Sequence, residues 1–555
     1  MSAGALGGLM SESNGDGVVI DGGSMTLEDV AAVARDGDRV TLSEADSVRR
    51  AMAESVALRE ELIDSRVPIY GITTGFGDSV NRQIPPEKAA ELQEHAVAHQ
   101  GVATGPTLPP AGARAVAAVR ANNLVRGHSA IRAEVVELLC AMLNRGVTPA
   151  IPEQASVGAS GDLAQLSYVA AALTGDREVQ YEGEERPAGE ALADVDLDPV
   201  TLEPKEALAL MNGTAFMTGI GALAAVDARR LATLADVCTA MATEALGGIT
   251  SPFHPFIHDE AKPHDGQVRS ARNVRWLLEG SDLAQPYERA VDEAGTIDDD
   301  GYRELSVSIQ DKYSLRCAPH FTGVLWDSLD WATDWLETEI NSSNDNPLFD
   351  LDSRGVFSGG NFAGGHVALA MDSLTTAVAS VADLLDRQLE LVVDEKFNGD
   401  LTPNLAPDLP EDHPKRALNH GFKGMQIACS GLTAEALNLC TPMTAFSRST
   451  EAHNQDKVSM GATAARQARD VVEIVERAAA IHLLALCQAA DLRGPERLGR
   501  TRRVYDAVRE EVEFLDEDRR MDRDVEAVQA MLHDGRLLAD LRADLADAGD
   551  VPVGE

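Results

Sequence analysis

Apolar residues recur every three to four positions along most of the chain, which is the pattern of amphipathic helices. Alanine-rich runs with this spacing occupy residues 86–103, 110–125 and 129–145. Residues 18–50 instead alternate short apolar runs with Gly and Asp, a pattern compatible with one or two small strands and a helix. The pattern predicts a mainly α fold with a smaller mixed region near the N-terminus.

The second half of the chain contains longer helical segments. Residues 205–247 are interrupted at Asn212-Gly213 and end at Gly247-Gly248. Residues 364–395 and 459–492 each continue for about thirty residues without proline, so as helices they would be about 45–50 Å long. Their Ala, Val, Leu and Ser content is too apolar for lone solvated helices. We therefore expect a long-helix bundle in which other subunits also take part.

Breaks in this pattern divide the chain into four predicted parts. Residues 1–17 are expected to form a flexible tail, 18–205 an N-terminal domain and 206–499 the long-helix bundle. Residues 500–555 alternate Arg with Asp and Glu and are expected to form a separate, exposed helical segment. The N-terminus lacks the features of a signal peptide, and no stretch approaches about 18 consecutive apolar residues. The sequence thus predicts a cytoplasmic protein without a membrane span.

The acidic excess of the chain excludes some partners. The 555 residues include 90 Asp and Glu against 48 Lys and Arg, a formal net charge of −42. Such a charge repels phosphate backbones, which excludes nucleic-acid binding as the main role. Only eight of the basic residues are Lys. An acid-rich, Lys-poor composition is typical of a halophilic protein whose surface charge is screened by salt.

A tight turn is predicted at Ser156-Val157-Gly158-Ala159-Ser160-Gly161-Asp162, because its residues are small. One interpretation is a Gly-rich turn leading into a helix, with Asp162 near the start of the helix. A serine-hydrolase elbow needs Gly where Asp162 stands, and a P-loop needs Gly-Lys-Ser/Thr, so both are excluded. The remaining interpretation is backbone cyclisation. The Gly161 nitrogen attacks the Ala159 carbonyl, and loss of water, including the Ser160 hydroxyl, leaves an exocyclic methylidene.

With this turn the sequence resembles the histidine/phenylalanine/tyrosine ammonia-lyases and related aminomutases, whose Ala-Ser-Gly becomes 4-methylidene-imidazol-5-one. Here the triplet is Ala159-Ser160-Gly161. The resemblance covers roughly residues 18–500 and implies a long-helix bundle of the ammonia-lyase/fumarase-like type. Six further motifs match in order: Tyr70-Gly71-Ile72-Thr73-Thr74-Gly75-Phe76-Gly77, Met211-Asn212-Gly213-Thr214, Gln310-Asp311-Lys312-Tyr313-Ser314-Leu315-Arg316, Asn344-Asp345-Asn346-Pro347, Gly359-Gly360-Asn361-Phe362 and Asn454-Gln455-Asp456.

The resemblance implies proton transfer by two tyrosines. Tyr70, on a mobile loop, is implied to remove the β-proton, and since a free tyrosine has a pKa of about 10, the site must stabilise its phenolate. Tyr313 is implied to transfer a proton or to orient the amine. Arg316 is implied to bind the substrate carboxylate, a task that suits a bidentate guanidinium.

The other implied site residues are amides and an aromatic ring. Asn212 and Gln310 are implied to hydrogen-bond the substrate or the prosthetic group, where a fixed donor offsets developing negative charge. Phe362 is implied to lie beside the electrophile, and Asn346 and Gln455 map to the pocket.

The implied reaction is non-oxidative deamination. The methylidene carbon takes the substrate amine and makes it a better leaving group, a base removes the β-proton, and ammonia departs to leave an α,β-unsaturated acid. The resemblance requires no metal and no diffusible cofactor, and the chain contains no HExxH, EF-hand or Rossmann pattern. The six cysteines show no CxxC or zinc-like spacing, so they are expected to be free thiols.

His99 and Gln100 occupy the two positions that govern substrate choice in the family. Histidine-specific members carry Ser-His there, bacterial tyrosine lyases His-Leu, plant phenylalanine lyases Phe-Leu, and fungal enzymes that accept both phenylalanine and tyrosine carry His-Gln. A His or Gln at the end of the pocket can hydrogen-bond a phenol hydroxyl. Asn454-Gln455-Asp456-Lys457 also lacks a Glu found in the histidine branch. We therefore predict conversion of tyrosine to coumarate or phenylalanine to cinnamate.

Three alternatives remain open. Histidine, giving urocanate, is the second candidate substrate, and a tyrosine or phenylalanine 2,3-aminomutase would use the same residues. A non-catalytic scaffold would be expected to lose site residues, whereas Tyr70, Ser160, Tyr313 and Arg316 are all present. By resemblance the small amino-acid substrate binds in a homotetramer whose sites are each assembled from three subunits.

Overall fold

A computed structural model of the chain describes residues 17–297 and 301–547. The predicted flexible tail at residues 1–17 lies almost wholly outside the described residues. The chain divides into two compact units, each described separately below. The first contains the described residues up to 226 together with 331–373 and 441–469, and the second contains 227–330, 374–440 and the described residues from 470 onward. The predicted boundaries at 205 and 499 stay a prediction.

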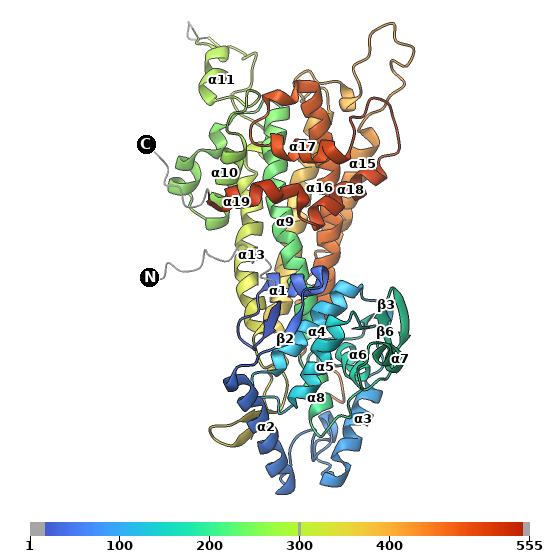
Figure 1. Ribbon diagram of the computed structural model, residues 1–555. Coiled ribbons are helices and arrows are strands. Elements are labelled where there is room, and N and C mark those ends of the chain that lie inside the picture. Colours follow the sequence, from blue (N-terminus) through green and yellow to red (C-terminus); the bar gives the residue numbers. More distant parts are fainter. Residues whose placement is uncertain (1–16, 298–300, 548–555) are drawn as a thin grey trace. The chain divides into compact units, whose positions relative to one another are not determined.

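The first unit combines short helices with several small sheets (Figure 1). Its short helices are α1 (Leu27–Ala31), α2 (Asp46–Asp64), α3 (Ala89–His99), α4 (Pro110–Leu124), α5 (Ala133–Asn144), α6 (Leu163–Leu173), α7 (Ala188–Asp194) and α8 (Glu206–Met211). Three of them follow the alanine-rich runs of the sequence. The core of α4 consists largely of small side chains, so neighbouring elements can approach it closely.

All the described strands belong to the first unit, and their sheets have two or three strands each. β1 (Val18–Ile20) and β2 (Val40–Leu42) pair in parallel. The other sheets are antiparallel. They pair β3 (Thr104–Thr107) with β5 (Pro152–Gln154), β6 (Glu178–Tyr181) with both β4 (Thr148–Pro149) and β7 (Glu184–Pro187), and β8 (Leu348–Asp350) with β9 (Gly355–Phe357). The small mixed region that the sequence predicts near the N-terminus is present.

Four long helices, of 22 to 33 residues, dominate the rest of the chain. They are α9 (Ala215–Ala245), α13 (Pro319–Ile340), α14 (Gly365–Val393) and α16 (Gly461–Arg493). The last two closely match the predicted helices at 364–395 and 459–492. With 58% of the residues helical and 7% in strands, the predicted mainly α fold is confirmed.

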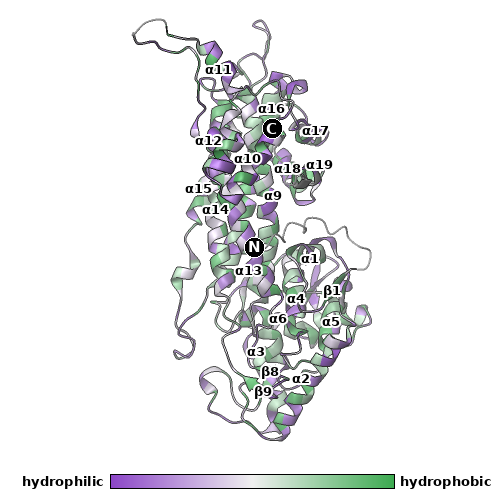
Figure 2. Cartoon of the chain, turned by 90° about the vertical axis from the view of Figure 1, so that its left-hand side faces the viewer, coloured by the Kyte–Doolittle hydropathy of each residue, from purple (hydrophilic) through white to green (hydrophobic). Residues whose placement is uncertain are grey.

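The long helices form because buried residues recur at helical spacing. In α16 the fully buried positions include Ala464, Ala468, Val471, Val475 and Ala478, which lie three or four residues apart. Nearly all of α9 is buried, as expected of a helix surrounded by others. Hydrophobic residues recur along the whole length of these helices (Figure 2).

In the second unit the long helices pack as a bundle and carry shorter helices. Trp326 on α13 donates a hydrogen bond to Asp236 on α9 at 3.1 Å, and Gln388 on α14 donates one to Thr239 on α9 at 3.0 Å. The shorter helices are α10 (Asp265–Leu277), α11 (Tyr287–Ala294), α12 (Tyr313–Arg316), α15 (Lys423–Asn438), α17 (Arg502–Glu511), α18 (Asp522–His533) and α19 (Ala539–Asp547).

The C-terminal segment is helical, but the expectation that it is separate and exposed is wrong. Val504, Tyr505 and Val508 of α17 are buried, and Arg509 donates a hydrogen bond to Asp491 of α16 at 2.6 Å. The alternating charges occupy only one side of these helices. Apolar residues at four-residue spacing form the other side, and this stripe packs against the rest of the second unit.

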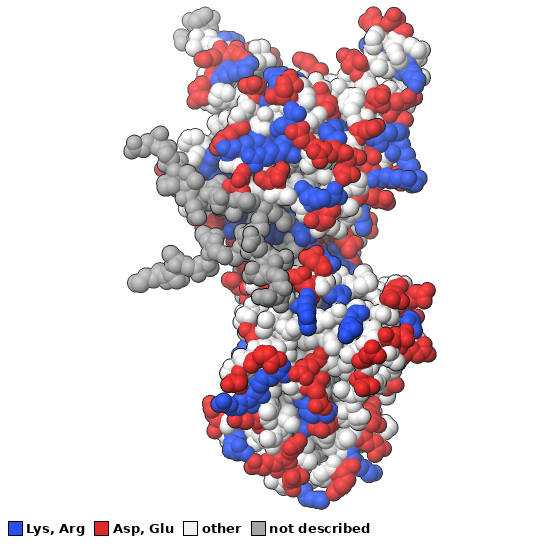
Figure 3. Space-filling model, viewed as in Figure 1, with Lys and Arg blue, Asp and Glu red and all other residues white. Residues whose placement is uncertain are grey.

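Among the described residues, α14 alone is long and apolar enough to be considered as a membrane span. Its most apolar window is 72% buried inside the protein, which is typical of a core helix. The six cysteines are all free thiols, and four of them are buried. Asp and Glu side chains are scattered over the visible face of both units, with fewer Lys and Arg between them (Figure 3).

The first unit buries an ion pair between Lys205 and Asp345, whose side chains are 0% and 1% exposed. Ser129 also donates a hydrogen bond to Asp345 at 2.7 Å. Lys205 immediately precedes α8, and Asp345 immediately precedes Asn346. The pair therefore fixes the start of α8 relative to the segment that carries Asn346.

Asp345→Ala is expected to lower the free energy of unfolding by about 3–5 kcal/mol, because Lys205 would stay buried without its partner. Glu61 forms an exposed ion pair with Arg354 in the same unit, so Glu61→Ala is expected to cost less than about 1 kcal/mol. Urea unfolding of both variants tests this difference. Equal shifts in the unfolding midpoint would contradict it.

Candidate active site

The first unit contains a cavity of about 710 Å³, a volume suited to a small organic ligand. Its wall comes from the loop at 70–84, from α3 and α8, and from the turn at 155–164. Residues at 346, 362, 451 and 455 complete it. The predicted site residues that line it are Tyr70, His99, Gln100, Ala159, Ser160, Gly161, Asn212, Asn346, Phe362 and Gln455.

The predicted turn is present and is tightly constrained. Ser160 has a φ of 55° and Gly161 a φ of 72°, both in the left-handed region. A Cβ atom on Gly161 would lie 2.0 Å from the carbonyl oxygen of Gly213, so no side chain fits there. The Asp162 amide donates to the same oxygen at 2.8 Å. The turn leads directly into α6, as the sequence predicts.

Asp162 anchors the turn through the hydrogen bonds of its side chain. Its side chain is fully buried and accepts hydrogen bonds from the Met217 amide at 2.9 Å and from the Ser156 hydroxyl at 2.8 Å. Burial raises the pKa of Asp162 to about 7, which these hydrogen bonds oppose. The Ser156 hydroxyl also accepts from the Gly158 amide at 2.9 Å. The Ser-Val-Gly half of the turn is therefore held by side-chain contacts as well as by the backbone.

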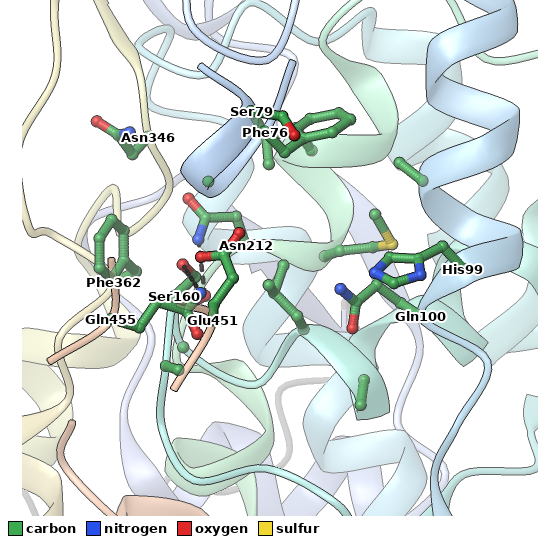
Figure 4. A pocket seen from close by; sticks show the side chains of 18 of the residues that line it. Phe76, Ser79, His99, Gln100, Ser160, Asn212, Asn346, Phe362, Glu451 and Gln455 are labelled. Carbon is green, nitrogen blue, oxygen red and sulfur yellow. Dashed lines mark hydrogen bonds between the residues drawn. The ribbon is translucent and has the colours of Figure 1, made fainter. Parts of the chain in front are cut away.

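Two amide side chains contact Ser160. The Nδ2 of Asn212 donates to the Ser160 carbonyl oxygen at 2.7 Å, and the Nε2 of Gln455 lies 3.3 Å from the Ser160 hydroxyl. The Oδ1 of Asn212 is buried and has no hydrogen-bond partner among the described residues. Figure 4 shows Asn212, Gln455 and Ser160 grouped together in the cavity. The site thus holds the Ser160 carbonyl with a fixed donor and leaves one amide oxygen available.

Glu451 lines the cavity beside this group and was not among the predicted residues (Figure 4). Residues 451–453 form a left-handed turn with φ values of 49°, 51° and 66°. The turn directs the Glu451 carboxylate onto the amide of Asp78 at 3.2 Å and against Gly77, where a Cβ would lie 1.5 Å from its oxygen. The sequence signal for Glu451 was its place four residues before Gln455, which belongs to a matched motif. The close approach of Glu451 to Gly77, however, depends on the left-handed turn at residues 451–453.

Tyr70 lies on the loop that Glu451 contacts. Its hydroxyl oxygen accepts a hydrogen bond from the Gly77 amide at 3.0 Å. Burial raises the pKa of Tyr70, the Gly77 hydrogen bond opposes that rise, and the negative charge of Glu451 adds to it. Tyr70 is thus neutral at neutral pH, and a cationic ligand near Glu451 would ease its ionisation.

His99 and Gln100 lie across the cavity from Phe362 (Figure 4). His99 is the last residue of α3, and Gln100 follows it as the C-cap. Arg177 donates to the carbonyl of Val97 at 2.6 Å, and Ser167 donates to the carbonyl of Gln100 at 3.1 Å. These bonds satisfy backbone carbonyls that have no donor within the helix, so the end of α3 is fixed.

Comparison with known proteins places this site in a family. Residues 25–510 match the family described as aromatic amino acid lyase. The chain belongs to the aromatic amino acid lyase family. It is 41% identical to a histidine ammonia-lyase of Anaeromyxobacter dehalogenans, over 94% of this chain and 99% of that protein. It is 39% identical to a tyrosine ammonia-lyase of Cupriavidus metallidurans, over 94% and 97% respectively. A solved tyrosine aminomutase of Streptomyces globisporus has a TM-score of 0.88 at 36% identity and covers 97% of this chain and 100% of that one.

Three residues expected in the lyase site do not line the cavity. Gln310, Tyr313 and Arg316 belong to the second unit. The Arg316 guanidinium stacks over the Tyr313 ring at 4.6 Å, and Tyr313 is 71% exposed. Gln388 of α14 donates to the carbonyl of Ser314 at 2.9 Å and so fixes the short helix α12. The expected site residues of the lyase chain therefore belong to two different units.

The described part of the lyase chain contains no group of three His, Cys, Asp or Glu side chains arranged to hold a metal ion. The side chains hydrogen-bonded to Ser160 are the amides of Asn212 and Gln455, and the Glu451 carboxylate in the cavity accepts a hydrogen bond from the Asp78 amide.

Replacing Glu451 with Gln is expected to lower the pKa of Tyr70, because the substitution removes a negative charge that opposes phenol ionisation. The tyrosinate absorbance of Glu451→Gln can be titrated against pH, with the same titration of a Tyr70→Phe variant subtracted. Glu87→Gln, at an exposed carboxylate that pairs with Arg66, is the matched control and is expected to leave the Tyr70 pKa unchanged. An unchanged or raised Tyr70 pKa in Glu451→Gln would refute this interpretation.

Proposed function

We propose that this lyase converts an aromatic amino acid to ammonia and an α,β-unsaturated acid, with tyrosine or phenylalanine preferred. The observation that carries the proposal is the strained Ser160-Gly161 turn in the cavity wall, whose carbonyl oxygen accepts from Asn212 at 2.7 Å. A cavity of about 710 Å³ beside it accommodates an aromatic amino acid.

The turn is proposed to close into 4-methylidene-imidazol-5-one. A bond forms from the Gly161 nitrogen to the Ala159 carbonyl carbon, and two water molecules leave, one of them with the Ser160 hydroxyl. The residues fit this group, because Gly161 has no room for a Cβ and the Ser160 carbonyl oxygen already has a fixed donor. When formed, the ring supplies an electrophilic carbon that makes an amine a better leaving group.

The chain's own residues supply the proton acceptor and the polar contacts. The Tyr70 oxygen receives the β-proton of the substrate, and the Gly77 amide stabilises its phenolate through the 3.0 Å hydrogen bond. The Glu451 carboxylate lies in the cavity beside Ser160 and attracts the substrate ammonium. Because Glu451 also raises the pKa of Tyr70, binding of the ammonium makes Tyr70 a stronger acid and eases formation of the phenolate.

We infer that Gln310, Tyr313 and Arg316 reach the cavity from another chain of a homotetramer. Support comes from the exposure of Tyr313, which leaves it accessible to a second copy of the chain. Helices α13, α14 and α15 also expose large apolar side chains that a second copy would cover. Phe321, Val324, Leu369, Ile427 and Leu437 are between 44% and 63% exposed. Arg316 would then bring to each site a cation for the substrate carboxylate, against the net charge of −42.

The substrate choice rests on the end of the cavity formed by α3. His99 and Gln100 line it and can hydrogen-bond a phenol hydroxyl, which favours tyrosine. Histidine is the second candidate, because the relative from Anaeromyxobacter dehalogenans is named a histidine ammonia-lyase. The likeness to a tyrosine aminomutase keeps a 2,3-aminomutase as a third product outcome.

The test incubates purified protein with tyrosine, phenylalanine or histidine in concentrated KCl. The protein is expected to release ammonia and to give the absorbance of coumarate from tyrosine or of cinnamate from phenylalanine. Ser160→Ala is expected to reduce turnover to background while leaving the fold intact, because the ring cannot form without the Ser160 hydroxyl. Urocanate alone would favour the second candidate, and a β-amino acid would favour the mutase. Turnover by Ser160→Ala equal to that of the unaltered protein would disprove the proposed role of the turn.

Co-expression of Ser160→Ala and Arg316→Met chains tests the shared site. Each variant alone is expected to be inactive, whereas mixed assemblies are expected to regain activity in roughly a quarter of their sites if the two residues come from different chains. The control is a mixture of the two variants purified separately and kept from exchanging subunits. If both residues came from one chain, no mixed assembly would regain activity.

A further inference from the structure

Arg120 of α4 is a fully buried arginine whose hydrogen bonds all end on neutral oxygens. It donates to the Oδ1 of Asn344 at 2.8 Å, to the carbonyl of Asn212 at 2.9 Å and to the carbonyl of Ala209. Its Nε atom is buried without a hydrogen-bond partner. Burial lowers the pKa of Arg120 to about 10, and the charge of Asp345 opposes this. A buried cation without a directly bonded carboxylate is costly, so its position requires an explanation.

Two of the three oxygens that Arg120 contacts lie at the C-terminal end of α8. The last carbonyls of a helix have no donors within the helix, and they carry the negative end of its dipole. The Arg120 guanidinium supplies both the donors and the opposite charge at the Ala209 and Asn212 carbonyls. The residue therefore fixes the end of α8 and the first residue beyond it.

Arg120 holds the Asn212-Gly213 segment, and this segment contacts the Ser160-Gly161 turn. Asn212 donates to the Ser160 carbonyl, and Gly213 faces Gly161 as a backbone bridge. A Cβ on Gly213 would lie 2.3 Å from the Arg120 Nη1 and 2.5 Å from the Asn344 Oδ1. Arg120 thus contacts one side of the Asn212-Gly213 segment, and the turn contacts the other side.

Asn344 connects this contact to further buried groups. Its Nδ2 donates to the Thr214 hydroxyl at 2.9 Å, and that hydroxyl donates to Glu339 at 2.5 Å. Because Asn344 is bonded on both sides, it orients the guanidinium of Arg120 as well as accepting from it. Arg120 itself does not line the cavity, so it acts on the site only through Asn212 and Gly213.

We propose that Arg120 is a positioning residue that holds Asn212 and Gly213 where ring closure at Ala159-Ser160-Gly161 and substrate binding require them. This inference rests on the proposed function of the turn. Misplacing a reacting group by about 1 Å can cost on the order of 10²-fold in rate, so loss of this hold has a measurable consequence.

Arg114 offers a matched comparison on the same helix. It also donates to backbone carbonyls, those of Val33 and Leu143, but neither belongs to the site. Burial lowers its pKa as well. A purely structural role for the arginines of α4, of which Arg114 is half-buried, predicts a loss of stability when either one is replaced, whereas the positioning role predicts a site-specific effect for Arg120 alone.

The test compares Arg120→Lys and Arg120→Met with Arg114→Lys in the full-length protein. Ring closure is read from the mass of the tryptic peptide at residues 146–177, which should be two water molecules lighter when the ring is present. We expect Arg120→Met to leave most of this peptide unmodified, and Arg120→Lys to lower kcat by on the order of 10²-fold with a much smaller change in KM. Arg114→Lys is expected to match the unaltered protein in peptide mass and in kcat.

Equal modified fractions and equal kcat values for Arg120→Lys and Arg114→Lys would overturn the proposal. If the Arg120 variants do not fold, Asn344→Ala removes one acceptor of the guanidinium and is expected to reduce the modified fraction and kcat by a smaller factor; no reduction would also overturn it. The mass readout needs no substrate. If the unaltered protein carries the modified peptide but deaminates no aromatic amino acid, the proposed function fails while the comparison at Arg120 still stands.

Discussion

The site depends on the contact between the backbones of Gly161 and Gly213, which leaves no room for a side chain on Gly161. This contact joins two segments that lie 52 positions apart in the sequence. It keeps the Ser160 carbonyl within hydrogen-bonding distance of the Asn212 side-chain amide. A substitution at Gly161 would have to move a whole segment, because the obstructing atoms belong to the Gly213 backbone, whereas a side chain on Gly213 would displace the Arg120 guanidinium and the Asn344 amide. The other groups of the cavity are useful only because the turn is held in this place.

Buried polar groups stabilise the part of the first unit that makes this contact. The Lys205–Asp345 pair, the Arg120–Asn344 contact and the Thr214–Glu339 hydrogen bond all lie in the first unit, and Asn344 links the last two through its hydrogen bond to Thr214. Such groups are expensive to bury, so their retention favours one arrangement of the chain over alternatives. The acidic excess of the protein, by contrast, is visible on its surface (Figure 3).

The sequence was sufficient for the helices and for the local chemistry of the site. Helical spacing located α14 and α16, and small residue types located the Ser160-Gly161 turn. Contacts set by tertiary packing were not predictable. Glu451 reaches Gly77 only because three successive residues adopt left-handed conformations, and the C-terminal helices are buried because their charges occupy one side alone. Motif order likewise could not show that Tyr313 and Arg316 belong to a different unit from Ser160.

The central claim is that the Ala159-Ser160-Gly161 turn closes into a ring. An accurate mass of the tryptic peptide at residues 146–177 from the purified, unaltered protein tests it most directly. The account predicts a mass lower than that of the encoded peptide by two water molecules, with fragment ions that assign the loss to residues 159–161. A peptide with its full encoded mass, from protein that is folded, would contradict the account.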